Sequence, residues 1–303
     1  MSIQDTKVLL INDIAGYGKV ALSAMLPILS YKGFNLYNLP TAIVSNTLNY
    51  EKFRIEDTTE YIEETLKIWK ELNFSFDVIS TGFIFTKKQM ETISKFCEEQ
   101  SKKGVFIFND PIMADNGELY SGISPDTVDY MKNIISVSDV TMPNYTESCL
   151  LTKTKYKEGI STEEINAIIN KIREIGVKSV VVTSIPSVET KMVAGFDSKI
   201  NEYFYLPYEE IPTYFPGTGD IFSSVIISET LEGKSLKVAT EKAMKIVKEI
   251  VFENKDQEDK KKGIHIEKYL NLFEWTTPTY RSGTFLGSMC FYSYLLNSVD
   301  KRV

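Results

Sequence analysis

The sequence predicts an α/β fold in which a central, mostly parallel β-sheet carries helices on both faces. Short apolar or β-branched runs alternate with amphipathic stretches along the 303 residues. Runs that are apolar throughout are typical of parallel strands buried on both faces, and their alternation with helices is typical of right-handed βαβ units. No Ser/Gly-rich linker or internal repeat divides the chain, so we expect one domain over residues 1–273.

Six segments carry the pattern of the predicted parallel strands. They are KVLLIND (7–13), NLYNLP (35–40), FDVISTGFI (76–84), GVFIFNDPI (104–112), DVTMPN (139–144) and SVVVTSI (179–185). Two further runs within residues 191–210, KMVAGF and NEYFYLPYE, have the pattern of a hairpin. We therefore expect a small antiparallel addition at one edge of the sheet.

Capping signals mark where several of the predicted helices begin. At 161–175, isoleucines follow helical spacing behind a capping box formed by Ser161 and Glu164. Thr86 and Gln89 repeat that start signal. Pro125 after Ser124 marks another start, because a proline at the first helical position lacks only an N–H that would have no partner there.

Composition excludes several classes of protein. With 41 acidic and 34 basic side chains the formal net charge is -7, so the surface should repel a phosphate backbone, and we expect no nucleic-acid partner. No apolar run approaches the roughly 20 residues that span a bilayer, and the N-terminus does not resemble a secretion signal, so we expect a cytoplasmic protein. Three scattered cysteines and one histidine, His265, disfavour disulfides and zinc sites. We expect His265 at the surface.

The most informative motif is Gly217-Thr218-Gly219-Asp220, at the start of a predicted helix. Glycines at a helix start let backbone N–H groups converge on an anion, which the helix dipole also favours. Asp220 would stand beside that anion and could act as a general base toward a hydroxyl. The alternative is that Asp220 only caps the helix.

Two other motifs place oxygen-bearing side chains after predicted strands. Asp110 and Asp115 follow one strand, and Asn144 and Glu147 follow the next. Ligands of open α/β sheets bind at the carboxyl ends of strands, and oxygen ligands suit Mg²⁺. Ordinary turns have a similar composition, so each motif is weak by itself.

Competing nucleotide motifs are absent or incomplete. Gly233-Lys234-Ser235 resembles the end of a P-loop, but Ser228 stands where its first glycine belongs. Gly16-Tyr17-Gly18 begins a loose dinucleotide fingerprint, which would indicate a nicotinamide dehydrogenase. The second strand, NLYNLP, ends without the acid that would hold a ribose. We therefore interpret the glycines at 16 and 18 as a tight turn.

Taken in order, these strings resemble the pyridoxal kinase branch of the ribokinase-like family over about residues 7–273. The resemblance is carried by INDIAGYGKVALSAMLPILSYKGFNLYNLPTAIVSN, DPIMADNGELY, TMPNYTE, the Thr-Ser pair in VVVTSI, and GTGD. It implies a ribokinase-like fold, ATP and Mg²⁺ as cofactors, a homodimer, and phosphorylation of the 5′-hydroxymethyl group of pyridoxal, pyridoxine or pyridoxamine. A monovalent-cation requirement and the preferred vitamer stay open.

The resemblance also implies roles for individual residues. The residues expected near the substrate are Asp13, Thr41, Ser45, Asn46, Phe83 and Tyr120. Those expected near ATP are Asp110, Asn144, Glu147, Thr183 and Ser184, with Asp110 and Glu147 at the metal. Those expected at the reaction itself are Gly217, Thr218 and Gly219 as the anion hole and Asp220 as the general base.

Departures from the family pattern leave two alternatives. Thr47 and Leu48 stand where better-known members have His and Thr, Phe83 stands where many have tyrosine, and Ala114 replaces a glycine. A hydroxymethylpyrimidine kinase is one alternative, although such kinases characteristically have cysteine at the position of Asp220. The other is a non-catalytic relative that binds a vitamer or a nucleotide. The aromatic-rich tail, residues 274–303, has no predicted role.

Overall fold

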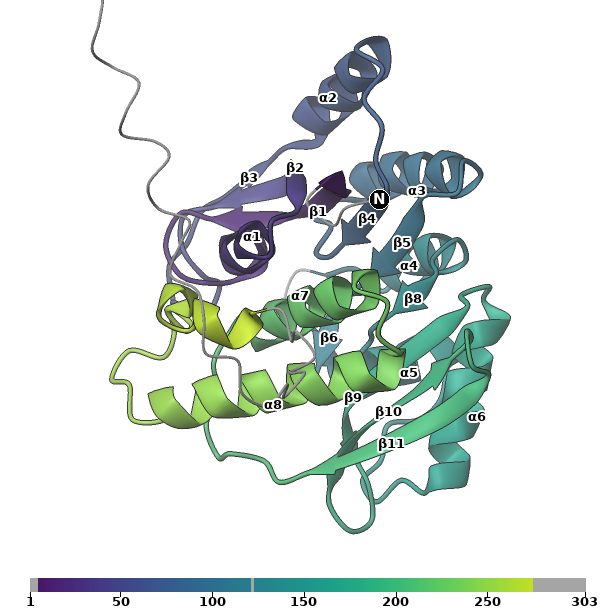
Figure 1. The fold of residues 1–303 in the computed structure, drawn as a ribbon, viewed down its shortest axis with the longest axis vertical. Coiled ribbons are helices and arrows are strands. Elements are labelled where there is room, and N and C mark those ends of the chain that lie inside the picture. Colours follow the sequence, from purple (N-terminus) through teal and green to yellow (C-terminus); the bar gives the residue numbers. More distant parts are fainter. Residues whose placement is uncertain (1–4, 121–122, 275–303) are drawn as a thin grey trace, which may run out of the picture.

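The computed structural model describes residues 5–120 and 123–274, so the predicted tail after Glu274 lies outside the described residues. Nine strands of the described part form one sheet in the order β11-β10-β9-β8-β5-β4-β1-β2-β3 (Figure 1). Neighbouring strands from β9 to β2 pair in parallel. The pairs β2–β3, β9–β10 and β10–β11 are antiparallel. The predicted fold class, a mostly parallel sheet with an antiparallel edge hairpin, is confirmed.

The elements alternate along the chain as expected. The sheet strands are β1 (Lys7–Ala15), β2 (Asn35–Val44), β3 (Ile55–Asp57), β4 (Val78–Thr81), β5 (Phe106–Asn109), β8 (Val140–Thr141), β9 (Ser179–Pro186), β10 (Lys191–Asp197) and β11 (Glu202–Tyr208). A separate two-stranded hairpin consists of β6 (Ala114–Asp115) and β7 (Glu118–Leu119). The helices are α1 (Ala21–Tyr31), α2 (Thr59–Glu71), α3 (Lys87–Ser101), α4 (Thr127–Ile135), α5 (Tyr145–Thr152), α6 (Thr162–Glu174), α7 (Thr218–Leu231) and α8 (Leu236–Asn254), followed by 3₁₀ turns at Ile266–Lys268 and Leu270–Phe273.

The capping signals form as their residues predict. Ser161 and Glu164 make both hydrogen bonds of a capping box at α6, and the hydroxyl of Thr86 accepts from the Gln89 N–H at α3. The helix expected at Pro125 begins slightly later, at Thr127, after a tight turn in which the Thr127 N–H donates to the Ser124 carbonyl. Local side-chain chemistry therefore decides these helix starts.

The strand predicted at 139–144 is much shorter than expected. Only Val140 and Thr141 belong to β8, because Pro143 has no N–H to donate and Asn144 caps α5. A single parallel bridge between Asn144 and Thr183 continues the pairing with β9. The chain thus leaves the sheet at the position where polar residues begin.

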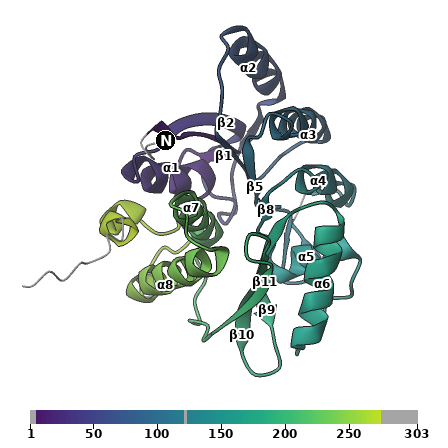
Figure 2. The same cartoon turned by 45° about the vertical axis from the view of Figure 1, so that its right-hand side comes forward.

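Alternation along β1 separates two apolar layers. Val8 and Leu10 pack in one cluster with residues of α1, α7 and α8, whereas Leu9 and Ile11 pack in another with residues of α3, α4, α5 and α6. Figure 2 shows the sheet between these two groups of helices. Burial on both faces explains why the parallel strands are apolar throughout.

Two predictions from composition can be compared with the structure. The side chain of His265 is 58% exposed, as expected. In residues 5–120 and 123–274, no helix combines the length and apolarity that a membrane crossing would require.

Candidate active site

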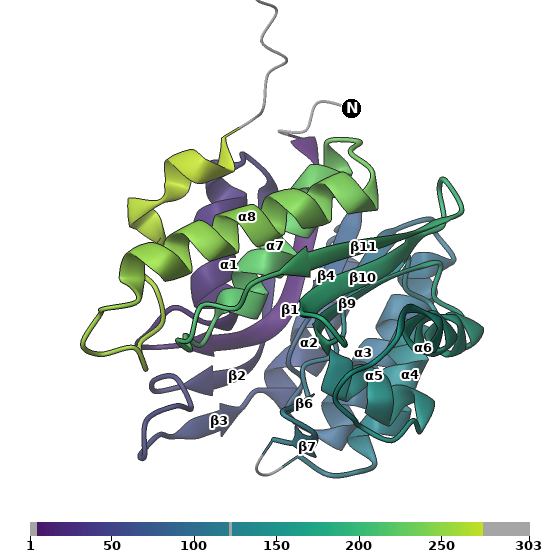
Figure 3. The ribbon, with the colours of Figure 1, turned by 90° about the horizontal axis from the view of Figure 1, so that it is seen from below.

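Side chains predicted to carry the chemistry gather at the carboxyl edge of the parallel strands. The ends of β1, β2, β4, β5, β8 and β9 lie on this edge, together with the amino end of α7. The β2–β3 and β6–β7 segments project from the same edge (Figure 3). The start of α7 is therefore close to the strand end at Asp110, whose carboxylate is repelled by that of Asp220.

The start of α7 depends on Gly217. This residue is the N-cap with φ +87, and a Cβ there would lie 2.1 Å from the Lys19 carbonyl oxygen. A side chain is thus excluded by both conformation and space. A Cβ at Gly219 would meet nothing within 4 Å, so that glycine leaves an open approach. Because Ile221 donates the hydrogen bond that returns to the Gly217 carbonyl, the earlier N–H groups of Thr218 and Gly219 lie outside the helical ladder.

The carboxylate of Asp220 is held by segments far away in sequence. Asp220 is 9% exposed; its Oδ2 accepts from the Ala21 N–H at 2.7 Å, and its Oδ1 accepts from the Asn12 side-chain amide at 3.4 Å. Burial raises the pKa of Asp220 to about 6, although these hydrogen bonds oppose the shift. Since Gly217 is the N-cap of α7, the alternative that Asp220 is merely the N-cap is wrong.

Asp13 stands beside Asp220 at the end of β1. Burial raises the pKa of Asp13 to about 7, and the negative charge of Asp220 adds to the increase. The Asp13 N–H donates to the Asn12 side-chain oxygen at 3.0 Å. Two carboxylates in this position cannot both ionise without cost, so this part of the site favours a proton or a positive charge.

Asp110 contacts α7 one helical turn beyond Asp220. The Ser223 hydroxyl donates to Asp110 Oδ2 at 2.8 Å. Burial raises the pKa of Asp110 to about 7, and repulsion from Asp220 contributes further. Ser223 thereby links the strand end after β5 to α7.

Glu147 is part of a capping box at α5 and also holds the chain after β5. One of its oxygens accepts from the Asn144 N–H at 2.8 Å, and the other accepts from the N–H of Met113 at 3.0 Å and, more weakly, of Ala114 at 3.4 Å. Burial, followed by repulsion from Asp110, raises the pKa of Glu147 well above its usual range. Glu147 therefore has a structural role, and its role at a metal stays a prediction.

The pair Asp110 and Glu147 has the chemistry of a cation site. Glu147 is buried, and the charge of Asp110 adds to the increase in its pKa, so a bound cation would relieve the repulsion. In the described part of the chain, however, no three His, Cys, Asp or Glu side chains are grouped to hold a metal. Mg²⁺ would fit here with phosphate and water oxygens as its remaining ligands.

Thr183 and Ser184 lie where β9 passes the start of α5. The Thr183 N–H donates to the Pro143 carbonyl at 3.1 Å, and Thr183 forms the bridge with Asn144. Ser184 has φ +58, a conformation uncommon for a residue with a side chain, and contacts Tyr208. The structure thus brings the predicted nucleotide-side residues Asn144, Thr183 and Ser184 together.

Residues expected near the substrate divide into two groups. Thr41 is fully buried and its hydroxyl donates to the Phe83 carbonyl at 2.7 Å, so it can act on a ligand only by positioning Phe83. Ser45 and Asn46 hydrogen bond to each other at 2.7 Å, at the rim beyond β2. Asn46 also donates to the Lys52 carbonyl and so organises its own loop.

Two tyrosines stand at the mouth of the site. Tyr120 is 42% exposed, and desolvation together with the charge of Glu147 raises its pKa. Tyr214 is 61% exposed. The charge of Asp220 contributes to the raised pKa of Tyr214, and Tyr214 in turn contributes to the raised pKa of Tyr120. Sequence reasoning identified Tyr120 but missed Tyr214, whose place three residues before Gly217 was an available signal.

Three other residues of the site were missed. Ser223 is three positions after Asp220, a spacing that would have placed it on the same helical face. Asn12 accepts from the Phe83 N–H at 2.9 Å while it donates to Asp220, and its position next to Asp13 was an available signal. Ala21 contributes only a backbone N–H, and nothing in an alanine signals such a role.

Comparison with known proteins shows which family the chain is similar to. The family model for phosphomethylpyrimidine kinase matches residues 30–265. A crystal structure with pyridoxal, of a candidate phosphomethylpyrimidine kinase from Bacteroides thetaiotaomicron, is 31% identical, with 89% of this chain and 96% of that chain covered and a TM-score of 0.84. A pyridoxal kinase of Dictyostelium discoideum is 25% identical over 287 residues, or 89% of this chain and 92% of the relative. A hydroxymethylpyrimidine/phosphomethylpyrimidine kinase of Aquifex aeolicus is 28% identical over 235 residues, or 75% and 87%.

Proposed function

Because the chain belongs to the phosphomethylpyrimidine kinase family, we propose that it is an ATP-dependent pyridoxal kinase. The reaction transfers the γ-phosphoryl group of ATP to the 5′-hydroxymethyl group of pyridoxal, pyridoxine or pyridoxamine. The observation that carries this function is that the buried carboxylate of Asp220 lies next to the N–H groups of Thr218 and Gly219, which donate no hydrogen bond within the helix. Phosphoryl transfer needs such alignment and charge stabilisation more than it needs covalent help.

In this mechanism Asp220 is the general base. It accepts the proton of the substrate hydroxyl as that oxygen attacks the γ-phosphorus. With a pKa of about 6 in the free protein, Asp220 is mostly ionised at neutral pH and still basic enough to take a proton. The hydrogen bonds from Ala21 and Asn12 orient the carboxylate.

The backbone of residues 217–220 is the anion hole. The N–H groups of Thr218 and Gly219 point out of the helix start and stabilise the negative charge on the transferred group, with support from the helix dipole. The open space at Gly219 allows the phosphate to approach the backbone closely.

Asp110, and Glu147 through water, would hold Mg²⁺, which when bound neutralises charge on the phosphates. This assignment is supported by the burial of Glu147 and by the repulsion that Asp110 exerts on it. Asn144, Thr183 and Ser184 bind the phosphates from the β8–β9 side. Asp13, Ser45, Asn46, Phe83 and Tyr120 bind the vitamer, with Thr41 acting through Phe83. A homodimer and a cytoplasmic location remain predictions.

A hydroxymethylpyrimidine kinase is the second candidate, because the family description and the Aquifex aeolicus relative both name pyrimidine substrates. The Dictyostelium discoideum relative and the pyridoxal in the Bacteroides thetaiotaomicron structure favour a B6 vitamer. Both candidates use the same phosphoryl-transfer machinery, so the acceptor alone distinguishes them.

One screen tests the function. ATP consumption is measured with Mg²⁺ and each of pyridoxal, pyridoxine, pyridoxamine, hydroxymethylpyrimidine and ribose. We expect the highest kcat/KM with a B6 vitamer, and about 10²–10⁴-fold lower kcat for Asp220→Asn with its fold retained. Preference for hydroxymethylpyrimidine would select the second candidate. Binding of a vitamer without turnover would show a non-catalytic relative, and unchanged kinetics of Asp220→Asn would remove Asp220 as the base.

A further inference from the structure

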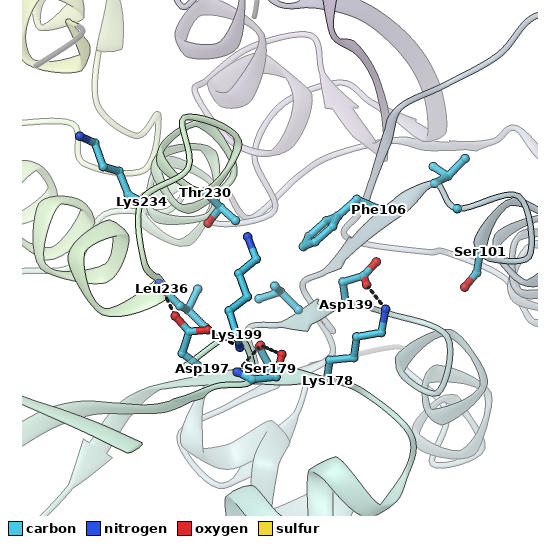
Figure 4. A pocket seen from close by; sticks show the side chains of 14 residues that line it. Ser101, Phe106, Asp139, Lys178, Ser179, Asp197, Lys199, Thr230, Lys234 and Leu236 are labelled. Atoms are coloured by element: carbon cyan, nitrogen blue, oxygen red, sulfur yellow. Dashed lines mark hydrogen bonds and ion pairs between the residues drawn. The ribbon is translucent and has the colours of Figure 1, made fainter. Parts of the chain in front are cut away.

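A cavity of about 410 Å³ opens at the edge of the sheet opposite to the candidate active site (Figure 4). Phe106, Val140 and Ser179 line it from the amino ends of β5, β8 and β9. Lys199 lines it from the turn after β10, and Thr230 and Leu236 line it from the end of α7 and the start of α8. The volume is within the range of small-molecule sites.

Lys199 supplies a positive charge inside this cavity. Its side chain rises from the turn after β10 toward the space between Thr230 and Phe106 (Figure 4). The ammonium nitrogen lies 5.9 Å from the centroid of the Phe106 ring. Within residues 5–120 and 123–274, Lys199 forms no ion pair, so its charge is available to a ligand.

The two carboxylates on the cavity wall already have partners. Asp197 accepts from the N–H groups of Lys199 at 2.9 Å and Leu236 at 2.8 Å. Asp139 accepts from the Ile107 N–H at 2.8 Å and from the Lys178 ammonium at 2.6 Å. These bonds reduce the repulsion that either acid would exert on an anion.

The Thr230 hydroxyl adds an unused polar group. Thr230 is 8% exposed, and its Oγ1 is buried without a hydrogen-bond partner in the described part of the chain. A hydroxyl inside a helix commonly donates to the carbonyl four residues earlier, as Ser224 does in the same helix and Thr240 in the next. Leaving a buried hydroxyl unpaired is costly, and an acceptor atom in the cavity would remove that cost.

We propose that this cavity is a second binding site, which takes a small aromatic anion. Its carboxylate or phosphate oxygens bind the Lys199 ammonium and accept from the Thr230 hydroxyl, and its flat ring packs against Phe106 with Val140 and Leu236 around it. Thr230 is ten residues beyond Asp220 on α7, which at 1.5 Å per residue is about 15 Å. The site is therefore separate from the anion hole at the start of the same helix.

Calorimetric titration of the full chain, with saturating ADP, Mg²⁺ and pyridoxine in the active site, tests the proposal. Phenyl phosphate is the probe because it combines a ring and an anion, and inorganic phosphate and phenol each supply one half. We expect phenyl phosphate to bind one site at least about tenfold more tightly than either half. Absence of saturable binding, or equal binding of inorganic phosphate alone, would overturn the proposal.

Variants locate the bound probe. Lys199→Met should weaken binding of phenyl phosphate about tenfold or more, because it removes a charge-assisted contact but keeps the apolar stem. Lys234→Met is the matched control, since Lys234 lies at the rim and its side chain points away from the cavity (Figure 4). It should change the affinity less than about twofold.

Two more variants separate this site from the kinase site. Thr230→Val keeps the side-chain volume, so it should preserve Tm while weakening phenyl phosphate binding several-fold. Asp220→Asn should bind the probe like the unmodified chain, whatever it does to turnover. Binding that survives Lys199→Met and Thr230→Val, or that is lost in Asp220→Asn, would rule out the proposed site without affecting the proposed kinase function.

Discussion

The backbone N–H of Ala21 donates to Oδ2 of Asp220 at 2.7 Å, across 199 positions of sequence. Ala21 holds this place with φ +48, which is uncommon for a residue with a Cβ. It is the first residue of α1, and it forms an isolated antiparallel bridge with Ile14. The start of α1 and the start of α7 are therefore linked by this hydrogen bond.

Substitutions at Ala21 should separate conformation from the hydrogen bond. Ala21→Gly keeps the N–H and accepts a positive φ, so kcat should stay within about twofold and stability within about 1 kcal/mol. Ala21→Val adds a β-branched side chain at a left-handed position that is 4% exposed, and should cost about 2 kcal/mol or more while lowering kcat. Urea unfolding and steady-state kinetics measure both. Equal behaviour of the two variants would contradict a conformational role for Ala21.

Asn12→Asp should move the pH profile of activity. If Asp220 is the base, kcat/KM rises as the pH increases through about 6, because the base must be ionised. Aspartate at position 12 still accepts from the N–H groups of Asp13 and Phe83 but no longer donates to Asp220, and its charge adds repulsion. The pKa of Asp220 should increase, so the acidic limb should shift to higher pH by about one unit. If the acidic limb of the kcat/KM profile does not shift, Asn12 has no influence on the pKa of the base.

Alanine substitutions at Gly217 and Gly219 should have different effects on stability. Gly217→Ala places a Cβ against the Lys19 carbonyl at 2.1 Å and at φ +87, and should cost about 2–4 kcal/mol of stability. Gly219→Ala meets nothing within 4 Å, so its Tm should change by less than about 2 °C. If kcat falls or the KM for ATP increases in Gly219→Ala, the cause must then be contact between the added Cβ and the bound phosphate. Full activity of Gly219→Ala would argue against a close approach of the phosphate to this backbone.

Asp13→Asn should stabilise the protein at alkaline pH. The pKa of Asp13 in the folded protein is about 7, above its ordinary value of 3.8. The contribution of Asp13 to the free energy of unfolding is therefore greatest at low pH, where Asp13 is protonated in the folded and unfolded states, and it is lost as the pH rises through about 7. Asparagine removes this penalty. We expect about 1–2 kcal/mol more stability than the unmodified chain at pH 8, decreasing toward zero near pH 4. Denaturant unfolding at both pH values measures it, with Asp256→Asn, at an exposed position, as the control.

Much of the fold could be predicted because its signals are local. The capping box at Ser161 and the hairpin at 191–210 each depend on neighbouring residues, and each forms as predicted. The strand expected at 139–144 was too long, because Pro143 and Asn144 end the pairing. Apolar composition alone does not reveal where a strand's hydrogen bonds stop.

By itself the sequence determined the parallel α/β class and the main polar groups of the site, since glycines at a helix start and acids after strands carry their chemistry in their residue types. Only the tertiary structure decided how these groups are oriented and protonated. The hydrogen bonds to Asp220 from Ala21 and Asn12, and the repulsion among Asp13, Asp110 and Asp220, depend on segments that are distant in the chain. Burial and Coulomb interactions act through space, so no pattern of neighbouring residues encodes them.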